Sequence, residues 1–199
     1  MAQILYTYKD GVYANLTNLC NCQCTFCVRF QHEGIGDAPT LWHKVNPNWE
    51  QVKAAVDAFD FTGFKELVFC GYGEPTCALD LMLKTARYVR KIHPELKLRV
   101  NTNGLGSLEN GRDIVPDLAQ VLDAVSISLN APDEADYNKV TRPTLPGAYQ
   151  AMLDFARECK KKIPDTRMTV VDVLPPEQIE ASRKVAESCG IKLRVRKFA

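Results

Sequence analysis

The chain has 199 residues, of which 46% are hydrophobic and 25% are charged, and its formal net charge is +1. These values are typical of a globular protein, so we expect a single domain over residues 1–199. A net charge near zero gives no strong nucleic-acid signal, and no stretch reaches the ~20 consecutive apolar residues of a membrane helix.

The first residues predict a reducing compartment, and that compartment decides how the cysteines are interpreted. The start, MAQILYTYKDG, lacks the basic region and apolar core of a secretory signal, so we expect a cytoplasmic protein. The chain contains eight cysteines. In a cytoplasmic chain they are expected to be metal ligands, catalytic thiols or buried small side chains rather than disulfides.

The pattern of apolar residues predicts strands alternating with helices. The chain opens with two strands, over 4–8 and 12–16, joined by an Asp-Gly turn, and a polar loop over 30–47 leads to a helix over 49–59. Further strands are expected over 66–70, 97–100, 125–129, 168–173 and 192–195, and helices over 79–92, 112–121, 145–161 and 176–189. This alternation predicts an α/β fold with a mainly parallel sheet. About six repeats predict a partial (β/α)6 TIM-like barrel that follows an N-terminal β-hairpin.

A short loop after the second predicted strand contains the spacing C-x3-C-x2-C, formed by Cys20, Cys24 and Cys27. Thiolates are the natural ligands of iron–sulfur clusters, and a 4Fe-4S cubane normally takes four of them, one for each iron. Three ligands would leave one iron open to a chelating molecule. Cys22 lies in the same loop, and with it the site would be a closed zinc or redox site. Because Cys22 alternates with its neighbours along the loop, we expect no such convergence and rank a zinc-binding module last.

This spacing, with the aromatic Phe26 directly before the last cysteine, resembles the signature C-x3-C-x-aromatic-C of the radical S-adenosylmethionine (SAM) superfamily. The resemblance implies a radical SAM core fold. It also implies that Cys20, Cys24 and Cys27 hold a 4Fe-4S cluster, whose open iron binds the amino and carboxylate groups of SAM. Phe26 would then lie near the adenine.

Two later strand ends carry further matches to this superfamily. Gly71-Tyr72-Gly73-Glu74-Pro75 is similar to its Gly-Gly-Glu-Pro motif, with Tyr72 in place of the second glycine. In the family this segment meets the methionine amino group, chiefly through its backbone. Asn101-Thr102-Asn103-Gly104 is similar to its Thr-Asn-Gly segment, which makes Asn103 a candidate contact for the ribose or the carboxylate of SAM.

A third match follows the strand predicted over 125–129. Ser126, Ser128 and Asn130 resemble the polar side chains of the family's Ser-Leu-Asn segment, which face SAM. The period-two alternation of a strand places these three residues on one face and Ile127 with Leu129 on the other. A polar row inside a barrel suggests a ligand.

The resemblance implies a reaction as well as two cofactors. A reduced 4Fe-4S cluster cleaves SAM to methionine and a 5'-deoxyadenosyl radical, which abstracts hydrogen from an unidentified small-molecule or peptide substrate. The electron would come from an external flavodoxin-like or ferredoxin-like reductant. The whole chain is most similar to the short TatD family-associated radical SAM proteins, which suggests a functional link to a TatD-type nuclease. A glycyl-radical-enzyme activase and a 7-carboxy-7-deazaguanine-synthase-like enzyme remain alternatives.

Few residues suggest a substrate contact. Arg142 is a candidate clamp for a carboxylate or phosphate, or a surface arginine that pairs with Asp133 or Asp136. Asp172 has apolar neighbours and would contact a ligand or cation if it points inward, or a helix lysine if it points outward.

Other polar and thiol side chains are weaker candidates. His32 and His43 are expected in a solvated loop. Cys70 and Cys77 flank the segment 71–75, here called the glycine turn, and are expected to be structural, although a catalytic role stays open.

Overall fold

The chain begins with the expected hairpin, formed by β1 (Leu5–Tyr8) and β2 (Gly11–Ala14). The computed structural model describes residues 2–197. Its hairpin loop differs by one residue from the expected Asp-Gly turn. Tyr8 pairs with Gly11, so the loop residues are Lys9 and Asp10, and Lys9 adopts a left-handed φ of 53°.

The hairpin continues into one seven-stranded sheet with the strand order β1-β2-β3-β4-β5-β6-β7. All neighbours from β2 onward are parallel. In the described residues the two edge strands do not pair with each other, so the sheet is an open partial barrel, which confirms the predicted α/β class. The remaining strands are β3 (Glu66–Phe69), β4 (Lys97–Thr102), β5 (Ala124–Ser128), β6 (Asp165–Val171) and β7 (Lys192–Arg196).

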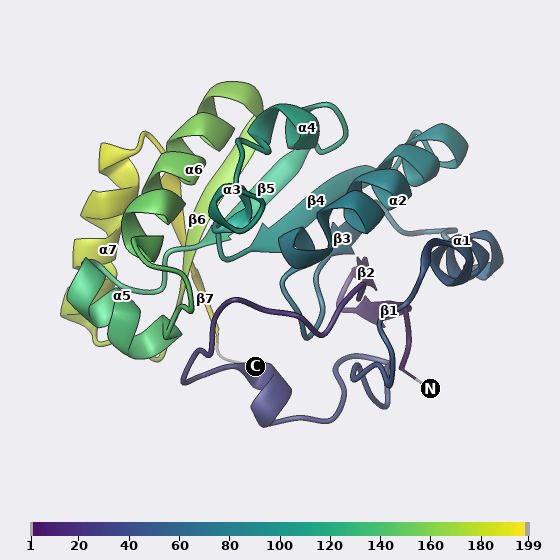
Figure 1. Ribbon diagram of the computed structural model, residues 1–199, viewed down its shortest axis with the longest axis horizontal. Coiled ribbons are helices and arrows are strands. Elements are labelled where there is room, and N and C mark those ends of the chain that lie inside the picture. The colour runs from purple at the N-terminus through teal and green to yellow at the C-terminus, as the bar shows by residue number, and fades with distance from the viewer. Residues whose placement is uncertain (1, 198–199) are drawn as a thin grey trace.

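Helices cover one face of this sheet (Figure 1). The core lies between them and the sheet, where alternate strand residues such as Leu98, Val100, Ile127 and Met168 are fully buried. No helix in residues 2–197 has the length and apolar character needed to span a membrane. The helices are α1 (Trp49–Ala58), α2 (Leu79–Ile92), α3 (Gly106–Glu109), α4 (Val115–Ala119), α5 (Glu134–Thr141), α6 (Ala148–Lys162) and α7 (Pro176–Ser188), with 3-10 turns η1 (Val28–Phe30) and η2 (Pro75–Ala78).

Two helical regions differ from the prediction. The helix expected over 112–121 is shorter, because α4 begins at Val115 and is preceded by the separate turn of helix α3. The pattern also missed α5, whose first turn is capped by the Asp133 carboxylate accepting from the Asp136 N–H. Only Tyr137 and Thr141 of α5 are buried, so the helix has almost no apolar periodicity.

Candidate functional site at the carboxyl ends of the strands

The cysteine loop leaves the carboxyl end of β2 and is fixed by backbone hydrogen bonds. The Gln23 and Thr25 N–H groups donate to carbonyl oxygens at the end of α5, each over 2.9 Å, and the Glu74 N–H donates to the Leu19 carbonyl over 2.7 Å. The loop is therefore held between α5 and the turn that follows β3, as the side-by-side course of these segments in Figure 1 illustrates. These bonds hold the cysteines at this edge of the sheet.

The four cysteines of the loop have different surroundings. Cys20, Cys24 and Cys27 are half-buried, whereas Cys22 is buried in the core with 3% exposure. Burial, with a further contribution from the Glu74 charge, raises the pKa of Cys20 to about 12, and burial also raises the pKa of Cys27. A hydrogen bond between the Cys22 and Cys24 thiols lowers the pKa of Cys24 and raises that of Cys22. The positive charge of Arg29 opposes the rise in the pKa of Cys20 and of Cys27, and a bound metal ion would favour their thiolates further.

The spacing of these side chains bears on the kind of metal site. Within residues 2–197, no group of three or more His, Cys, Asp or Glu side chains lies close enough to hold one metal ion. A structural zinc site requires such convergence. In a cubane each cysteine binds its own iron, so the thiols stay apart. Three half-buried thiols in one loop are the kind of donor set that a 4Fe-4S cluster with one open iron takes.

The glycine turn after β3 lies directly against the start of the cysteine loop. A Cβ atom on Gly71 would lie 2.1 Å from Asn15 Oδ1, and one on Gly73 would lie 2.2 Å from the Thr17 carbonyl oxygen. Only glycine permits this approach. Tyr72, which replaces a glycine of the family motif, turns its ring into a small cluster with Leu41 and donates a hydrogen bond to the His32 carbonyl. Its side chain is therefore accommodated away from the glycines.

Glu74 is buried, and its carboxylate links the ends of β3 and β4 through hydrogen bonds. Its Oε1 accepts from Thr76 N over 3.1 Å, from Thr76 Oγ1 over 2.8 Å and from Thr102 Oγ1 over 2.7 Å, and its Oε2 accepts from Asn103 N over 2.8 Å. Burial raises the pKa of this carboxyl group, and the four hydrogen bonds oppose that shift. Because both oxygens are used within the protein, the backbone of this segment is what it can offer to a ligand.

Asn103 also connects the turn after β4 to the cysteine loop. Its Nδ2 donates to Asn21 Oδ1 over 2.6 Å, its Oδ1 accepts from Leu105 N over 3.0 Å, and Asn21 Nδ2 donates to Glu109 Oε2 over 2.9 Å. Sequence reasoning missed this positioning role, because no pattern showed that position 21 would face position 103. The contact of Asn103 with SAM stays a prediction.

The polar row on β5 lies as the alternation predicted. Ile127 and Leu129 are fully buried, whereas Ser126 and Ser128 are half-buried on the opposite face. Asn130 follows the strand with a left-handed φ of 61°, and its buried Oδ1 has no hydrogen-bond partner in the described residues. An unsatisfied buried carbonyl costs about 1–3 kcal/mol, so this atom has the capacity to accept one more hydrogen bond.

The two candidate substrate residues lie at the rim of the sheet. Arg142 ends α5 with a φ of 46° and lines an open hollow of about 620 Å³ beside the cysteine loop. Within residues 2–197 its guanidinium forms no ion pair, because Asp133 caps α5 and Asp136 accepts from Gln178. Asp172 is exposed and lies one residue beyond β6, so it is not a buried carboxylate that requires a ligand or cation.

The weaker candidates, two histidines and the thiols of Cys70 and Cys77, have different surroundings. His43 is not the solvated side chain that was expected, because its Nε2 lies 2.9 Å from the Asn15 carbonyl and burial lowers its pKa. His32 is exposed, as expected. Burial raises the pKa of Cys70 and raises that of Cys77 to about 12, so neither is poised as a thiolate.

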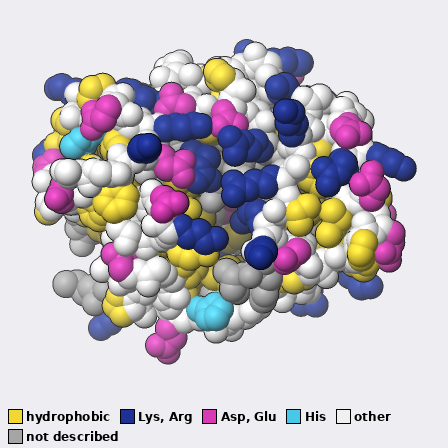
Figure 2. Space-filling model, turned by 180° about the vertical axis from the view of Figure 1, so that it is seen from behind, with side chains coloured by type: hydrophobic (Ala, Val, Ile, Leu, Met, Phe, Trp, Pro, Cys, Tyr) yellow, Lys and Arg dark blue, Asp and Glu magenta, His cyan; other side chains and the backbone are white. Residues whose placement is uncertain are grey.

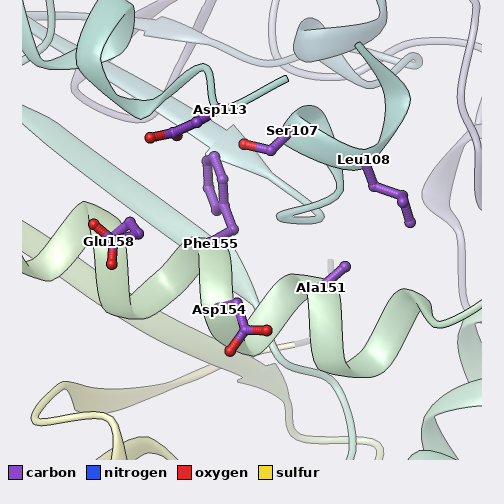
Figure 3. A pocket seen from close by; sticks show the side chains of 7 residues that line it. All are labelled: Ser107, Leu108, Asp113, Ala151, Asp154, Phe155 and Glu158. Atoms are coloured by element: carbon purple, nitrogen blue, oxygen red, sulfur yellow. The ribbon is translucent and has the colours of Figure 1, made fainter. Parts of the chain in front are cut away.

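A second pocket, of about 360 Å³, lies on the helix side between α3, the segment before α4, and α6. In Figure 3 the Phe155 ring stands on α6 and points toward Asp113 and Ser107, and Glu158 and Asp154 lie on the same helix. None of the predicted site residues lines this pocket, so it is separate from the strand ends.

An open, mostly parallel sheet with a three-cysteine loop after its first parallel strand defines a partial-barrel α/β protein of the radical SAM type. The family model described as the radical SAM superfamily matches residues 14–188, and the chain belongs to this superfamily. Its members use a 4Fe-4S cluster and SAM.

Individual relatives agree with this assignment. The chain is 29% identical over 138 residues to the GTP 3',8-cyclase of Paenarthrobacter nicotinovorans. The matched region covers 64% of this chain and 34% of the cyclase. A radical SAM methyltransferase from Sphaerobacter thermophilus has a similar fold, with a TM-score of 0.64 and 16% identity over 97% of the chain and 57% of its own. The enzyme anSMEcpe, solved with bound AdoMet and the Cp18Cys peptide, also has a similar fold. The TM-score is 0.63 and the identity is 16%, and the match covers 94% of this chain and 50% of that enzyme. The chain thus spans about a third of the curated relative and about half of these solved chains.

Proposed function

We propose that this chain is a radical SAM enzyme in which Cys20, Cys24 and Cys27 hold the 4Fe-4S cluster. The observation that carries the proposal is the cysteine loop itself, which its own backbone bonds fix beside the glycine turn while Cys22 points into the core. When bound, the reduced cluster supplies the electron that cleaves the carbon–sulfur bond of SAM, and the resulting radical takes hydrogen from a small-molecule or peptide substrate.

The protein's part in this reaction is to bind and orient SAM. We assign that role to side chains and backbone groups that line the ends of β3, β4 and β5 next to the loop. The unpartnered Oδ1 of Asn130 and the close backbone approach at Gly71 and Gly73 support it. The residues proposed to contact SAM are Phe26, Gly71, Gly73, Glu74, Pro75, Asn103, Ser126, Ser128 and Asn130.

The setting of the reaction is also a proposal. Radical SAM enzymes need an external reductant, and we assign a cytoplasmic flavodoxin-like or ferredoxin-like protein to that role. We place the chain among the short TatD family-associated proteins, because its tyrosine-rich hairpin and its cysteine loop resemble theirs in sequence. A link to a TatD-type nuclease follows from that place. Neither the activase nor the deazaguanine-synthase alternative gains a supporting contact from the described residues.

The test is the formation of 5'-deoxyadenosine from SAM by anaerobically reconstituted, reduced protein. We expect the wild type to form it and Cys24→Ala to lose it completely. Cys159→Ala is the matched control, because it removes a fully buried cysteine of α6 that lies far from the loop in sequence and contacts only the core. A wild type that carries a reducible cluster and never cleaves SAM would overturn the proposal.

Asn130→Gly should make the protein more stable and bind SAM less tightly. The substitution removes both the left-handed strain and the unsatisfied buried carbonyl, each of which costs about 1 kcal/mol or more. We expect the free energy of unfolding to rise by about 1 kcal/mol and the Kd for SAM to rise about tenfold. Urea unfolding and calorimetric titration with SAM measure the two effects, and a variant that is less stable and binds SAM normally would contradict this role.

A further inference from the structure

The inner face of the sheet, opposite the helices, carries a row of basic side chains. Strand pairing places them there: Val68 is paired with Arg99, Ser126 with Arg167, and Val171 with Arg196. Partners in parallel strands point to the same face, so these arginines share the face of the half-buried Ser126. Figure 2 shows Lys and Arg side chains gathered across the middle of the molecule in the view from behind. The members of this basic row are Lys97, Arg99, Arg167, Lys192, Arg194 and Arg196.

The strands supply too few carboxylates to neutralise this row. Glu66 is bound to Arg99, with Nη2 donating to Oε1 over 2.8 Å and Nε donating to Oε2 over 3.2 Å. Asp165 is shared by Lys97, over 2.7 Å, and Arg167, whose Nε also donates over 2.7 Å. The basic residues of β7 form no ion pair within residues 2–197. The excess of positive charge therefore lies on the last strand.

Arg196 is half-buried, and two observations on it favour a bound anion. Its Nε is buried and has no hydrogen-bond partner among the described residues. Burial lowers the pKa of its guanidinium, and the nearby positive charges of Arg194 and Arg99 lower it further. Cys70 and Tyr13 also act on it electrostatically, so Arg196 lies near β2 and near the end of β3. A half-buried cation beside two like charges is stabilised when an anion reaches it.

We propose that Arg99, Arg194 and Arg196 bind the substrate through a doubly negative group, a phosphate or a pair of carboxylates. This assignment of a substrate class rests on the proposed function. Planar guanidinium groups bind both kinds of group in a bidentate manner. SAM does not meet the need, because its one carboxylate is outweighed by its ammonium and sulfonium charges. The three arginines thus select an anionic partner molecule in the interior of the partial barrel.

The test is calorimetric titration of the reconstituted full chain with inorganic phosphate and with malonate, at low ionic strength, with and without saturating SAM. We expect at least one dianion to bind with an affinity that SAM does not reduce. Tighter phosphate binding would indicate a phosphorylated substrate, and tighter malonate binding a dicarboxylate. Absence of binding by both probes, or loss of binding when SAM is present, would overturn the proposal.

Two variants with opposite expected effects on dianion binding distinguish a lost contact from a misfolded protein. Arg196→Gln should weaken dianion binding at least about tenfold, since a charge-assisted contact is lost. Glu66→Gln should strengthen it several-fold, because Arg99 loses its competing carboxylate. Arg87→Gln, on the exposed side of α2, is the matched control and should bind as the wild type does. An equal effect of Arg196→Gln and Arg87→Gln would refute the assignment. Because the readout is binding, it is independent of whether SAM is cleaved.

Discussion

Gly73→Ala should prevent assembly of the cluster site and destabilise the protein by about 2–3 kcal/mol. The added Cβ would lie 2.2 Å from the Thr17 carbonyl oxygen and 2.7 Å from that of Leu19. Both obstacles are backbone atoms, which cannot rotate away as a side chain can. The turn after β3 and the cysteine loop must therefore separate, and the hydrogen bond from Glu74 N to the Leu19 carbonyl is lost with them.

Iron content after reconstitution and urea unfolding measure the two effects of Gly73→Ala. Gly63→Ala is the matched control: its Cβ meets open space, and its φ of 85° adds only the cost of a left-handed conformation, about 1–2 kcal/mol. We expect that control to load iron normally. A Gly73→Ala protein that also loads iron normally would show that the close approach is not what places the loop.

Glu74→Gln should lower the free energy of unfolding by about 3 kcal/mol. The carboxylate accepts four hydrogen bonds, whereas an amide has one acceptor oxygen and brings two donors. If the glutamine oxygen faces Thr76 and Thr102, its NH2 group must face the Asn103 N–H. That half-buried donor would then lose its partner, and the hydrogen bonds that link the ends of β3 and β4 would be weakened.

Urea unfolding at neutral pH checks this expectation, with Glu95→Gln as the control for removing a negative charge. The Glu95 side chain is 65% exposed and lies 3.3 Å from His93 Nδ1, so its replacement should cost less than about 0.5 kcal/mol. Equal stabilities of the two variants would mean that the Glu74 hydrogen bonds contribute nothing. SAM binding by Glu74→Gln should fall as well, because the turn positions the backbone that the proposal assigns to SAM.

The order of the strands could be predicted from sequence because each parallel strand is a short apolar run followed by a helix. In such a sheet functional residues lie at the carboxyl ends of the strands. The cysteines, the glycine turn and the polar row of β5 all lie there. The alternation of Ser126 and Ser128 with Ile127 was readable for the same reason. These features are local in sequence, and a local pattern suffices to predict them.

Contacts between distant segments could not be predicted in this way. The link at Glu74 depends on Thr102 and Asn103, and the link from Asn103 to the cysteine loop depends on Asn21. The basic row has a signal in sequence, the alternation of basic and apolar residues over 192–196, but only the strand register shows that these residues share a face of the sheet with Arg99. Helix α5 has too few apolar residues to stand out.

The most direct test of the account is the count of iron and sulfide bound by the reconstituted wild type, by Cys24→Ala and by Cys22→Ala. If Cys20, Cys24 and Cys27 are the ligands, the wild type and Cys22→Ala should each bind about four irons per chain, and Cys24→Ala should bind almost none. Cys22→Ala removes a thiol from the same loop, so it controls for damage to the loop itself. Loss of iron from Cys22→Ala with retention by Cys24→Ala would contradict the proposed ligand set and the site built on it.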